Sequence, residues 1–328
     1  MRRREFIGLV GGLIAWPRTA QGQQAAAKVI GVLGFGSVEE ARGSFALAQR
    51  RLTEMGFIEG RNLSVEYYMA DNQEGRMAAL ARDLIQRRVD VITVFSGPSI
   101  VAARAATTSI PIVFFTGYDP VASGFVASLN RPGGNATGIT VLNTEVLAKR
   151  LELLRELVPR AKSIAFLVHR STNLVPGQDR IAKDMQSAAE LLGVELLFVE
   201  ASRSDDFEGA FAKIVSAQAD AVLVSADAFM FSNQTTLVDL AARHKIPAVY
   251  PTRGFTARGG LASYGTNYPE AYRQVGDYLG RVLNDEKPEN LPVQQVTKLQ
   301  LVINTKTAKA LGLTISPTLL ARADEVIE

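Results

Sequence analysis

The sequence predicts an α/β protein with two doubly wound lobes, and three observations support this prediction. Short apolar runs alternate with amphipathic segments from Val29 onward. Several runs are continuously apolar, as strands are when helices cover both faces of their sheet. The alternation starts again near residue 160, so the second half repeats the architecture of the first without obvious sequence identity. Strands that alternate with helices favour parallel sheets, because a parallel connection needs a crossover.

Eight short apolar runs are predicted to form the strands. The best-defined helix between them is predicted at Glu145–Val158, where Leu147, Leu151 and Leu154 fall on one face. Pro159 follows as a helix stop. The predicted strands are Val29–Leu33, Leu63–Tyr68, Val91–Phe95, Ile112–Phe115, Ile164–Val168, Val194–Val199, Ala221–Val224 and Ala248–Tyr250.

Residues 1–27 have the composition of an export signal. The arginines Arg2–Arg4 precede a short apolar run at Phe6–Trp16, and Ala20-Gln21-Gly22 follows. As a helix the apolar run would reach about 16 Å, roughly half of a bilayer core, so it is not expected to span a membrane. We expect cleavage between Gly22 and Ala27 and a soluble periplasmic protein afterwards.

Two export routes fit this segment. Arg3-Arg4-Glu5-Phe6-Ile7 resembles the twin-arginine signal, which carries folded proteins. A general secretion signal has the same basic, apolar and small-residue regions. The twin-arginine route is the one we expect.

Composition excludes several classes of function. The chain has 36 Lys and Arg against 33 Asp and Glu, but residues 1–27 contain four arginines and one glutamate. The remainder is therefore balanced, and nucleic-acid binding has no electrostatic support. The absence of cysteine excludes disulfides and thiolate sites, and His169 and His244 are too few for a multi-histidine metal centre. No metal is expected, and no cofactor, since Glu39 stands where GFG (34–36) would need a third glycine.

Polar groups follow several predicted strands in the first half. Thr116, Tyr118 and Asp119 come after Ile112–Phe115, at the edge where open α/β sheets bind ligands. We predict that they line a cleft between the lobes. Asp119 also precedes Pro120, so it could instead cap a helix, and Thr116 and Tyr118 are similarly ambiguous.

A second group of candidates follows the neighbouring strands. Ser96, Gly97 and Ser99 come before a predicted helix, whose free N–H groups would attract a carboxylate. The alternative is that Ser96 or Gly97 only caps this helix. Ser37, at the tip of the first strand, is a further candidate ligand contact.

The second half supplies the opposite wall of the predicted cleft. Asp227, after Ser225, lies several residues before a helix expected near Ser232, which favours a ligand role over capping. Phe229 could stack on a flat ligand or pack in the core. Two further candidates are Asn173 and Arg253, of which Arg253 would suit a carboxylate or be a surface residue.

Three stretches resemble one family of ABC-transporter substrate-binding proteins that includes binders of aromatic amino acids. They are SGPSIVAARAATTSIPIVFFTGYDPVASGFVASLNRPGGNATGIT (96–140), MGFIEGRNLSVEYYMA (55–70) and LVINTKTAKALGLTIS (301–316). The resemblance implies a type I periplasmic binding protein, with Rossmann-like lobes, parallel sheets and a hinge of three crossovers. In the family's aromatic-amino-acid binders an acid pairs with the ligand's amino group in a Thr-Asp-Asn context. Asp227 keeps that acid, while Ala228 replaces the amide.

The resemblance also implies a division of the chain. After the signal at 1–27, we expect residues 28–140 plus 252–286 in lobe 1 and 141–251 plus 287–328 in lobe 2. The expected function is that of a periplasmic receptor that hands an amino-acid-like or carboxylate ligand to an ABC permease with an ATPase subunit. We expect a monomer that is not an enzyme.

Two other functions stay open. The protein could be an exported sensor that feeds a signalling receptor. It could also be an exported hydrolase, with His169 near Ser171 and Thr172, although no G-x-S-x-G elbow is present.

Overall fold

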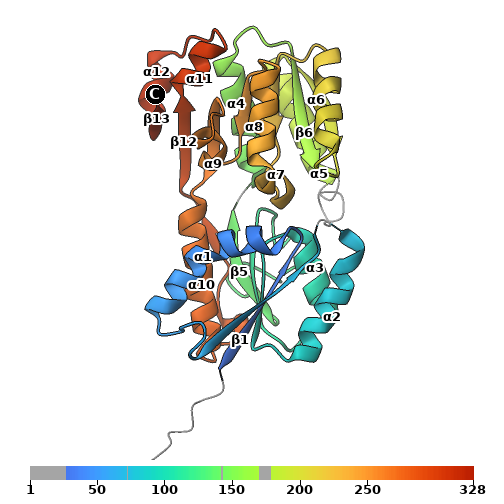
Figure 1. The fold of residues 1–328 in the computed structure, drawn as a ribbon, viewed down its shortest axis with the longest axis vertical. Helices are drawn as coiled ribbons and strands as arrows, with labels where there is room; N and C mark the ends of the chain where they lie inside the picture. The colour runs from blue at the N-terminus through green and yellow to red at the C-terminus, as the bar shows by residue number, and fades with distance from the viewer. Residues whose placement is uncertain (1–26, 72, 142, 170–178) are drawn as a thin grey trace, which may run out of the picture.

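The computed structural model describes residues 27–71, 73–141, 143–169 and 179–328 of the protein. The expected export signal lies outside these ranges except for its last residue, and so does Asn173. The described chain forms two α/β lobes, one above the other in Figure 1. In this part of the chain, none of the helices combines the length and the apolar character needed to cross a membrane.

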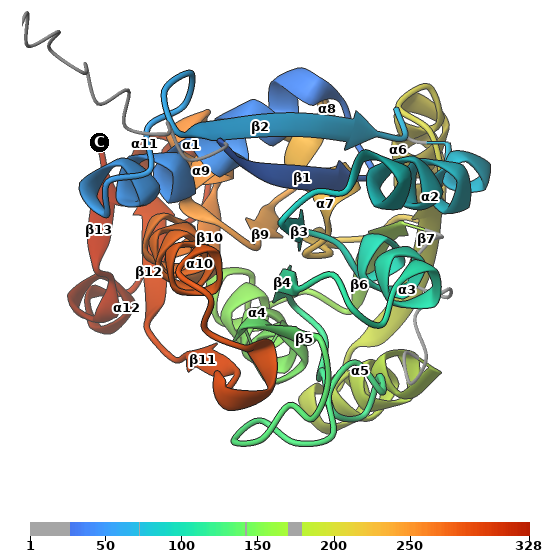
Figure 2. The same ribbon diagram turned by 90° about the horizontal axis from the view of Figure 1, so that it is seen from below.

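The first lobe is built on a parallel sheet of six strands. Helices α1 (Val38–Glu54) and α10 (Tyr268–Leu283) cover one face, and α2 (Met77–Arg87) and α3 (Gly97–Ala106) cover the other (Figure 2). Both faces are therefore buried, which explains the continuously apolar strands. The strands in spatial order are β11 (Gln294–Val296), β5 (Ala136–Val141), β4 (Ile112–Thr116), β3 (Val91–Val94), β1 (Lys28–Gly34) and β2 (Leu63–Met69).

The second lobe has a sheet of seven strands with helices on both faces. One face packs against α4 (Asn143–Leu157), α5 (Asp179–Leu192), α11 (Thr305–Ala310) and α12 (Pro317–Arg322). The other packs against α6 (Asp206–Ser216), α7 (Ala228–Ser232), α8 (Gln234–Arg243) and α9 (Arg253–Ala257). The strands in spatial order are β13 (Glu325–Ile327), β12 (Leu299–Asn304), β10 (Ala262–Thr266), β9 (Ala248–Tyr250), β8 (Ala221–Val224), β6 (Ser163–His169) and β7 (Glu195–Ala201).

All eight predicted strands are present, and the predicted helix is α4. The second sheet is not wholly parallel, because β12 runs antiparallel to β10. Among the strands that were not predicted, β5 has the sequence ATGITV, in which Gly138 interrupts the apolar pattern. A Cβ at Gly138 would lie 2.0 Å from the carbonyl oxygen of Phe114, so this glycine permits a close approach of the backbones.

The chain crosses between the sheets after β5, after β10 and after β11. The expected second and third crossings, at residues 252 and 287, are wrong. The chain at 252 turns into α9, and β10 then pairs with β9 in the second sheet, so this crossing comes at Asn267. Residues 287–296 lead into β11 of the first sheet, so the third crossing lies at 297–298.

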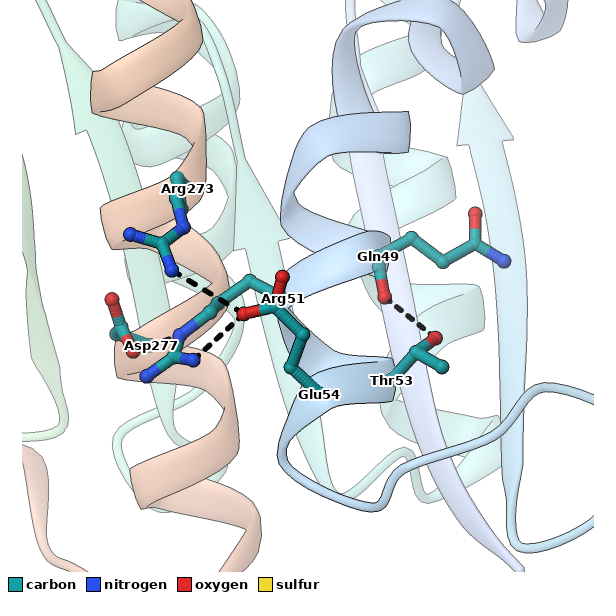
Figure 3. A network of polar contacts seen from close by, with 6 residues as sticks. All are labelled: Gln49, Arg51, Thr53, Glu54, Arg273 and Asp277. Carbon is teal, nitrogen blue, oxygen red and sulfur yellow. Dashed lines mark hydrogen bonds and ion pairs between the residues drawn. The ribbon is translucent and has the colours of Figure 1, made fainter.

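Helix α10 follows the second crossing, and close packing against α1 holds it on the first lobe. A Cβ at Gly276 of α10 would lie 2.5 Å from the carbonyl oxygen of Ala48 in α1. Figure 3 shows the polar contacts beside this interface. Arg51 of α1 donates to Asp277 of α10 at 2.5 Å, and this ion pair also joins the two helices. Arg51 donates as well to Glu54 of its own helix, at 2.8 Å. Such exposed pairs add little stability, so the apolar contact dominates this interface.

Candidate functional site

Two cavities lie between the lobes and share a wall. The inner cavity, of about 50 Å³, is lined by the residues that follow β3 and β4 in the first lobe and β6 and β8 in the second. The outer cavity, of about 790 Å³, lies beside the hinge, where α1 faces α8 and α9. The carboxyl ends of strands from both sheets thus meet at one place. The shared residues are Phe35, Phe95, Ser96, Phe115, Phe231 and Tyr268.

The first lobe contributes the start of α3 and the end of β4 to the inner cavity. Ser96 is the N-cap of α3, and its Oγ accepts from the Ser99 N–H at 3.4 Å and lies 2.6 Å from the Ser99 Oγ. Gly97 lines the cavity beside it. The Oγ1 of Thr116 accepts from the Tyr118 N–H at 3.1 Å, which fixes the turn that places both residues in the wall.

The second lobe contributes a carboxylate. Asp227 lines the inner cavity, and its Oδ1 accepts from the Met230 N–H at 3.0 Å. Its Oδ2 accepts from the Ser225 hydroxyl at 2.6 Å. Asp227 therefore caps α7, contrary to the expectation that the next helix begins too late for capping. A carboxylate has about four acceptor positions, so two local bonds leave it able to hold a ligand donor.

Tyr118 and Asp227 face the same cavity from opposite lobes. Burial raises the pKa of the Tyr118 phenol, and the negative charge of Asp227 raises it further. The phenol therefore keeps its proton and serves as a neutral hydrogen-bond donor or acceptor. The inner cavity thus has a negative end at Asp227 and hydroxyl groups around it.

Aromatic rings surround the inner cavity. His169, at the end of β6, lies between Phe229 of its own lobe, at 4.4 Å between ring centroids, and Phe35 of the other lobe, at 5.6 Å. Phe229 is 2% exposed and stacks on Phe207, so it is a core residue that also reaches the cavity. Phe231 packs against Tyr268 at 5.1 Å, where the hinge crosses.

Several predicted site residues lie away from both cavities. Asp119 is exposed, and its Oδ1 accepts from the N–H groups of Val121 and Ala122, so it caps a turn where a helix was expected. Ser99, in the first turn of α3, is fully buried, and Ser37 lies just beyond the wall residue Gly36. Ser225 stands behind Asp227 and positions it.

Arg253 lines the outer cavity but is already paired. Its Nε and Nη2 donate to the two carboxylate oxygens of Glu325, each at 2.6 Å. These hydrogen bonds hold the pKa of Glu325 below its usual value and raise that of Arg253. Arg253 thus pairs with a carboxylate, as its chemistry suggested, but this carboxylate belongs to the protein.

The cavity also contains residues that the sequence reasoning did not select. Phe35, Phe95 and Phe115 come at the ends of β1, β3 and β4, each next to a glycine, a serine or a threonine. His169 was considered only as a catalytic base. The available signal for Phe95 and Phe115 is an aromatic residue at the last position of a predicted apolar strand. Among the described residues, no group of three or more His, Asp or Glu could hold a metal ion.

Two α/β lobes, joined by three crossings and facing each other across a cavity at their strand ends, define the class of type I periplasmic binding proteins. This chain belongs to the family described as ABC transporter substrate binding protein, whose sequence profile matches residues 29–327. It is 28% identical over 278 residues to a tyrosine-binding protein of Clostridioides difficile (strain R20291), covering 84% of this chain and 78% of the relative.

Solved structures show the same fold. A conserved domain protein from Vibrio cholerae has a TM-score of 0.82 and 28% identity, over 92% of this chain and 99% of that one. A domain from Streptococcus pneumoniae in complex with L-Trp has a TM-score of 0.81 and 24% identity, over 92% and 100%. A ligand-free, open substrate-binding protein from Clostridium difficile has a TM-score of 0.61 and 25% identity, over 92% and 99%.

Proposed function

We propose that this protein is the periplasmic receptor of an ABC importer and that it binds an aromatic amino acid between its lobes. The observation that carries the proposal is Asp227, a carboxylate in the wall of a cavity surrounded by aromatic rings. An ammonium group would sit at Asp227, and the α-carboxylate would sit at the start of α3, beside Ser96 and Gly97.

The comparisons support this ligand class. One relative is named for tyrosine, and one structural neighbour was solved with L-Trp. The TM-score is 0.81 with the L-Trp complex and 0.61 with the open, ligand-free neighbour, a difference that agrees with a closed arrangement of the lobes. The ring contact between Phe35 and His169 across the lobes agrees with a closed arrangement.

Thermal unfolding of the protein without residues 1–27 tests the ligand class. The panel contains L-tyrosine, L-tryptophan, L-leucine and L-glutamate. It also contains tyramine, which lacks the carboxylate, and 3-(4-hydroxyphenyl)propionate, which lacks the amine. A ligand at 100 times its Kd adds about 2.7 kcal/mol of stability. We expect a clear rise in Tm with the aromatic amino acids alone. A panel without any shift, or a shift with the propionate and not the amino acids, contradicts the proposal.

The proposed location and partner follow from the N-terminal segment and the family. The protein would be exported by the twin-arginine route and deliver its ligand to a permease with an ATPase subunit. Changing Arg3 and Arg4 together to lysine should leave the precursor in the cytoplasm. If fractionation finds this double variant matured in the periplasm, the twin-arginine assignment is wrong.

A further inference from the structure

We infer that the ligand carries a second, anionic group far from its amino acid head, and that Arg258 in the outer cavity binds this group. The inference rests on the proposed function, since it takes Asp227 as the site of the ammonium group. The chemical class is an aromatic amino acid with a distal carboxylate or phosphate. The charge, the hydrogen bonds and the dimensions of the cleft lead to it.

The two cavities carry opposite charges. Among the described residues, the inner cavity is lined by the carboxylate of Asp227 and by no lysine or arginine. The outer cavity is lined by Arg253 and Arg258 and, in the same part of the chain, by no aspartate or glutamate. Arg253 is neutralised by its bidentate pair with Glu325. Arg258 is then the cation that gives the outer wall its charge.

The guanidinium of Arg258 keeps N–H donors that can bind a ligand. Its Nη1 donates to the side-chain oxygen of Gln234 at 3.1 Å and to the carbonyl oxygen of Gly254 at 2.8 Å. Both acceptors are neutral, and no ion pair joins Arg258 to an acidic residue in the described ranges. A guanidinium has five N–H donors in a fork that fits a carboxylate or a phosphate. The two bonds use Nη1 and hold the group against the cavity wall.

The placement of Asp227 and Arg258 makes the α-carboxylate a poor partner for Arg258. Asp227 precedes α7 and Gln234 follows it, and the five residues of α7 alone span roughly 8 Å at 1.5 Å each. Arg258 contacts Gln234 at the far end. The ammonium and carboxylate of an amino acid sit on one carbon, so a head held at Asp227 keeps its carboxylate near Ser96. Arg258 therefore suits a group at the other end of the ligand.

The volumes agree with an elongated ligand. The inner cavity of about 50 Å³ has space for a small head group only, since one water already needs about 10–15 Å³ of such a volume. The outer cavity of about 790 Å³ is near the upper end of the range for small-molecule pockets, about 300–1,000 Å³. Five of the six residues that line both cavities are aromatic, so the flat part of the ligand would lie among these rings, between head and tail.

Calorimetric titration with three matched ligands tests the inference: L-tyrosine, 4-carboxy-L-phenylalanine and O-phospho-L-tyrosine. The proteins are the parent, Arg258→Gln and Arg243→Gln, a control on α8 whose arginine pairs with Glu208. One or both acidic ligands should bind the parent about tenfold more tightly than L-tyrosine. Arg258→Gln should remove this gain and leave the Kd of L-tyrosine unchanged, and Arg243→Gln should keep it.

The outcomes separate this inference from the proposed function. If L-tyrosine binds and the acidic groups bring no gain, the inference is wrong and the proposed function stands. A gain that survives in Arg258→Gln also overturns the inference. If none of the three ligands binds the parent, both fail. A gain with phosphate alone or with carboxylate alone supports the inference and identifies which anion the ligand carries.

Discussion

The hydroxyl of Ser225 donates a hydrogen bond of 2.6 Å to Oδ2 of Asp227, while Oδ1 of the same carboxylate accepts from the N–H of Met230. Both oxygens are thus held from within the second lobe. The carboxylate cannot rotate freely, so it meets an incoming ammonium group in a fixed orientation. This preorganisation lowers the cost of ordering the site on binding.

Asp227→Asn should weaken the binding of L-tyrosine by about 30-fold or more. An amide keeps the shape of the carboxylate but leaves the enclosed ammonium unpaired, which costs about 2–5 kcal/mol. The Kd is measured by calorimetry, and the Tm confirms that the variant is folded. Asp119→Asn is the matched control, since Asp119 caps an exposed turn away from both cavities. Equal affinity in the parent and the folded Asp227→Asn variant would move the amine site elsewhere.

Ligand binding should compact the protein in solution. Three chain crossings form a hinge, and the inner cavity is enclosed by both lobes, so a bound ligand stabilises the closed arrangement. Small-angle scattering with saturating ligand should show a smaller radius of gyration than without it. Asp227→Asn at the same ligand concentration should show a smaller change, because its weaker site is only partly filled. Identical profiles of the parent in both conditions would count against closure.

Gly276→Ala should destabilise the first lobe by about 1–3 kcal/mol. The new methyl group would lie 2.5 Å from the carbonyl oxygen of Ala48 and 2.8 Å from Cβ of Arg51, so α1 and α10 would have to move apart. Chemical unfolding measures the change. Gly209→Ala in α6 is the control, because no atom lies within 4 Å of its added Cβ. It should stabilise by up to about 1 kcal/mol through helix propensity. A loss of stability in both variants would show that packing is not the cause.

Arg150→Met should raise the free energy of unfolding by about 1–2 kcal/mol at pH 7. Arg150 is 1% exposed; its Nε donates to the Tyr264 carbonyl at 2.5 Å, and its Nη1 has no partner among the described residues. Burial lowers the pKa of Arg150 to about 10, a shift that corresponds to a cost of about 3 kcal/mol for the charged form. Arg150→Met removes this cost but also loses the hydrogen bond to Tyr264, which offsets about 1 kcal/mol of the gained stability.

The pH dependence of this effect has a definite sign. The folded pKa of Arg150 lies below the unfolded one, so the cost is present in full below about pH 10 and fades as the pH rises above that value. The difference in unfolding free energy between Arg150→Met and the parent should therefore shrink above pH 10. A variant that is less stable than the parent at pH 7 would show that the guanidinium contributes more through its contacts than burial costs.

The sequence by itself determined the α/β class, eight of the strands and the places where polar groups follow them. These features are local, because the apolar runs and the residues that end them are contiguous in the chain. Thr116, Tyr118 and Asp227 were selected for this reason, and each lines the inner cavity. The sequence also assigns the chain to its family, through the profile match over residues 29–327.

Only the tertiary structure decided which strands share a sheet and which polar side chains reach the cavity. The family resemblance implied a crossing at residue 252, just before α9, but pairing of β10 with β9 keeps the chain in the second lobe. Asp119 and Asp227 look equivalent in sequence, yet Asp119 caps an exposed turn while Asp227 lines the cavity. The physical reason is that strand pairing and side-chain direction depend on contacts between residues far apart in the chain, which local patterns do not encode.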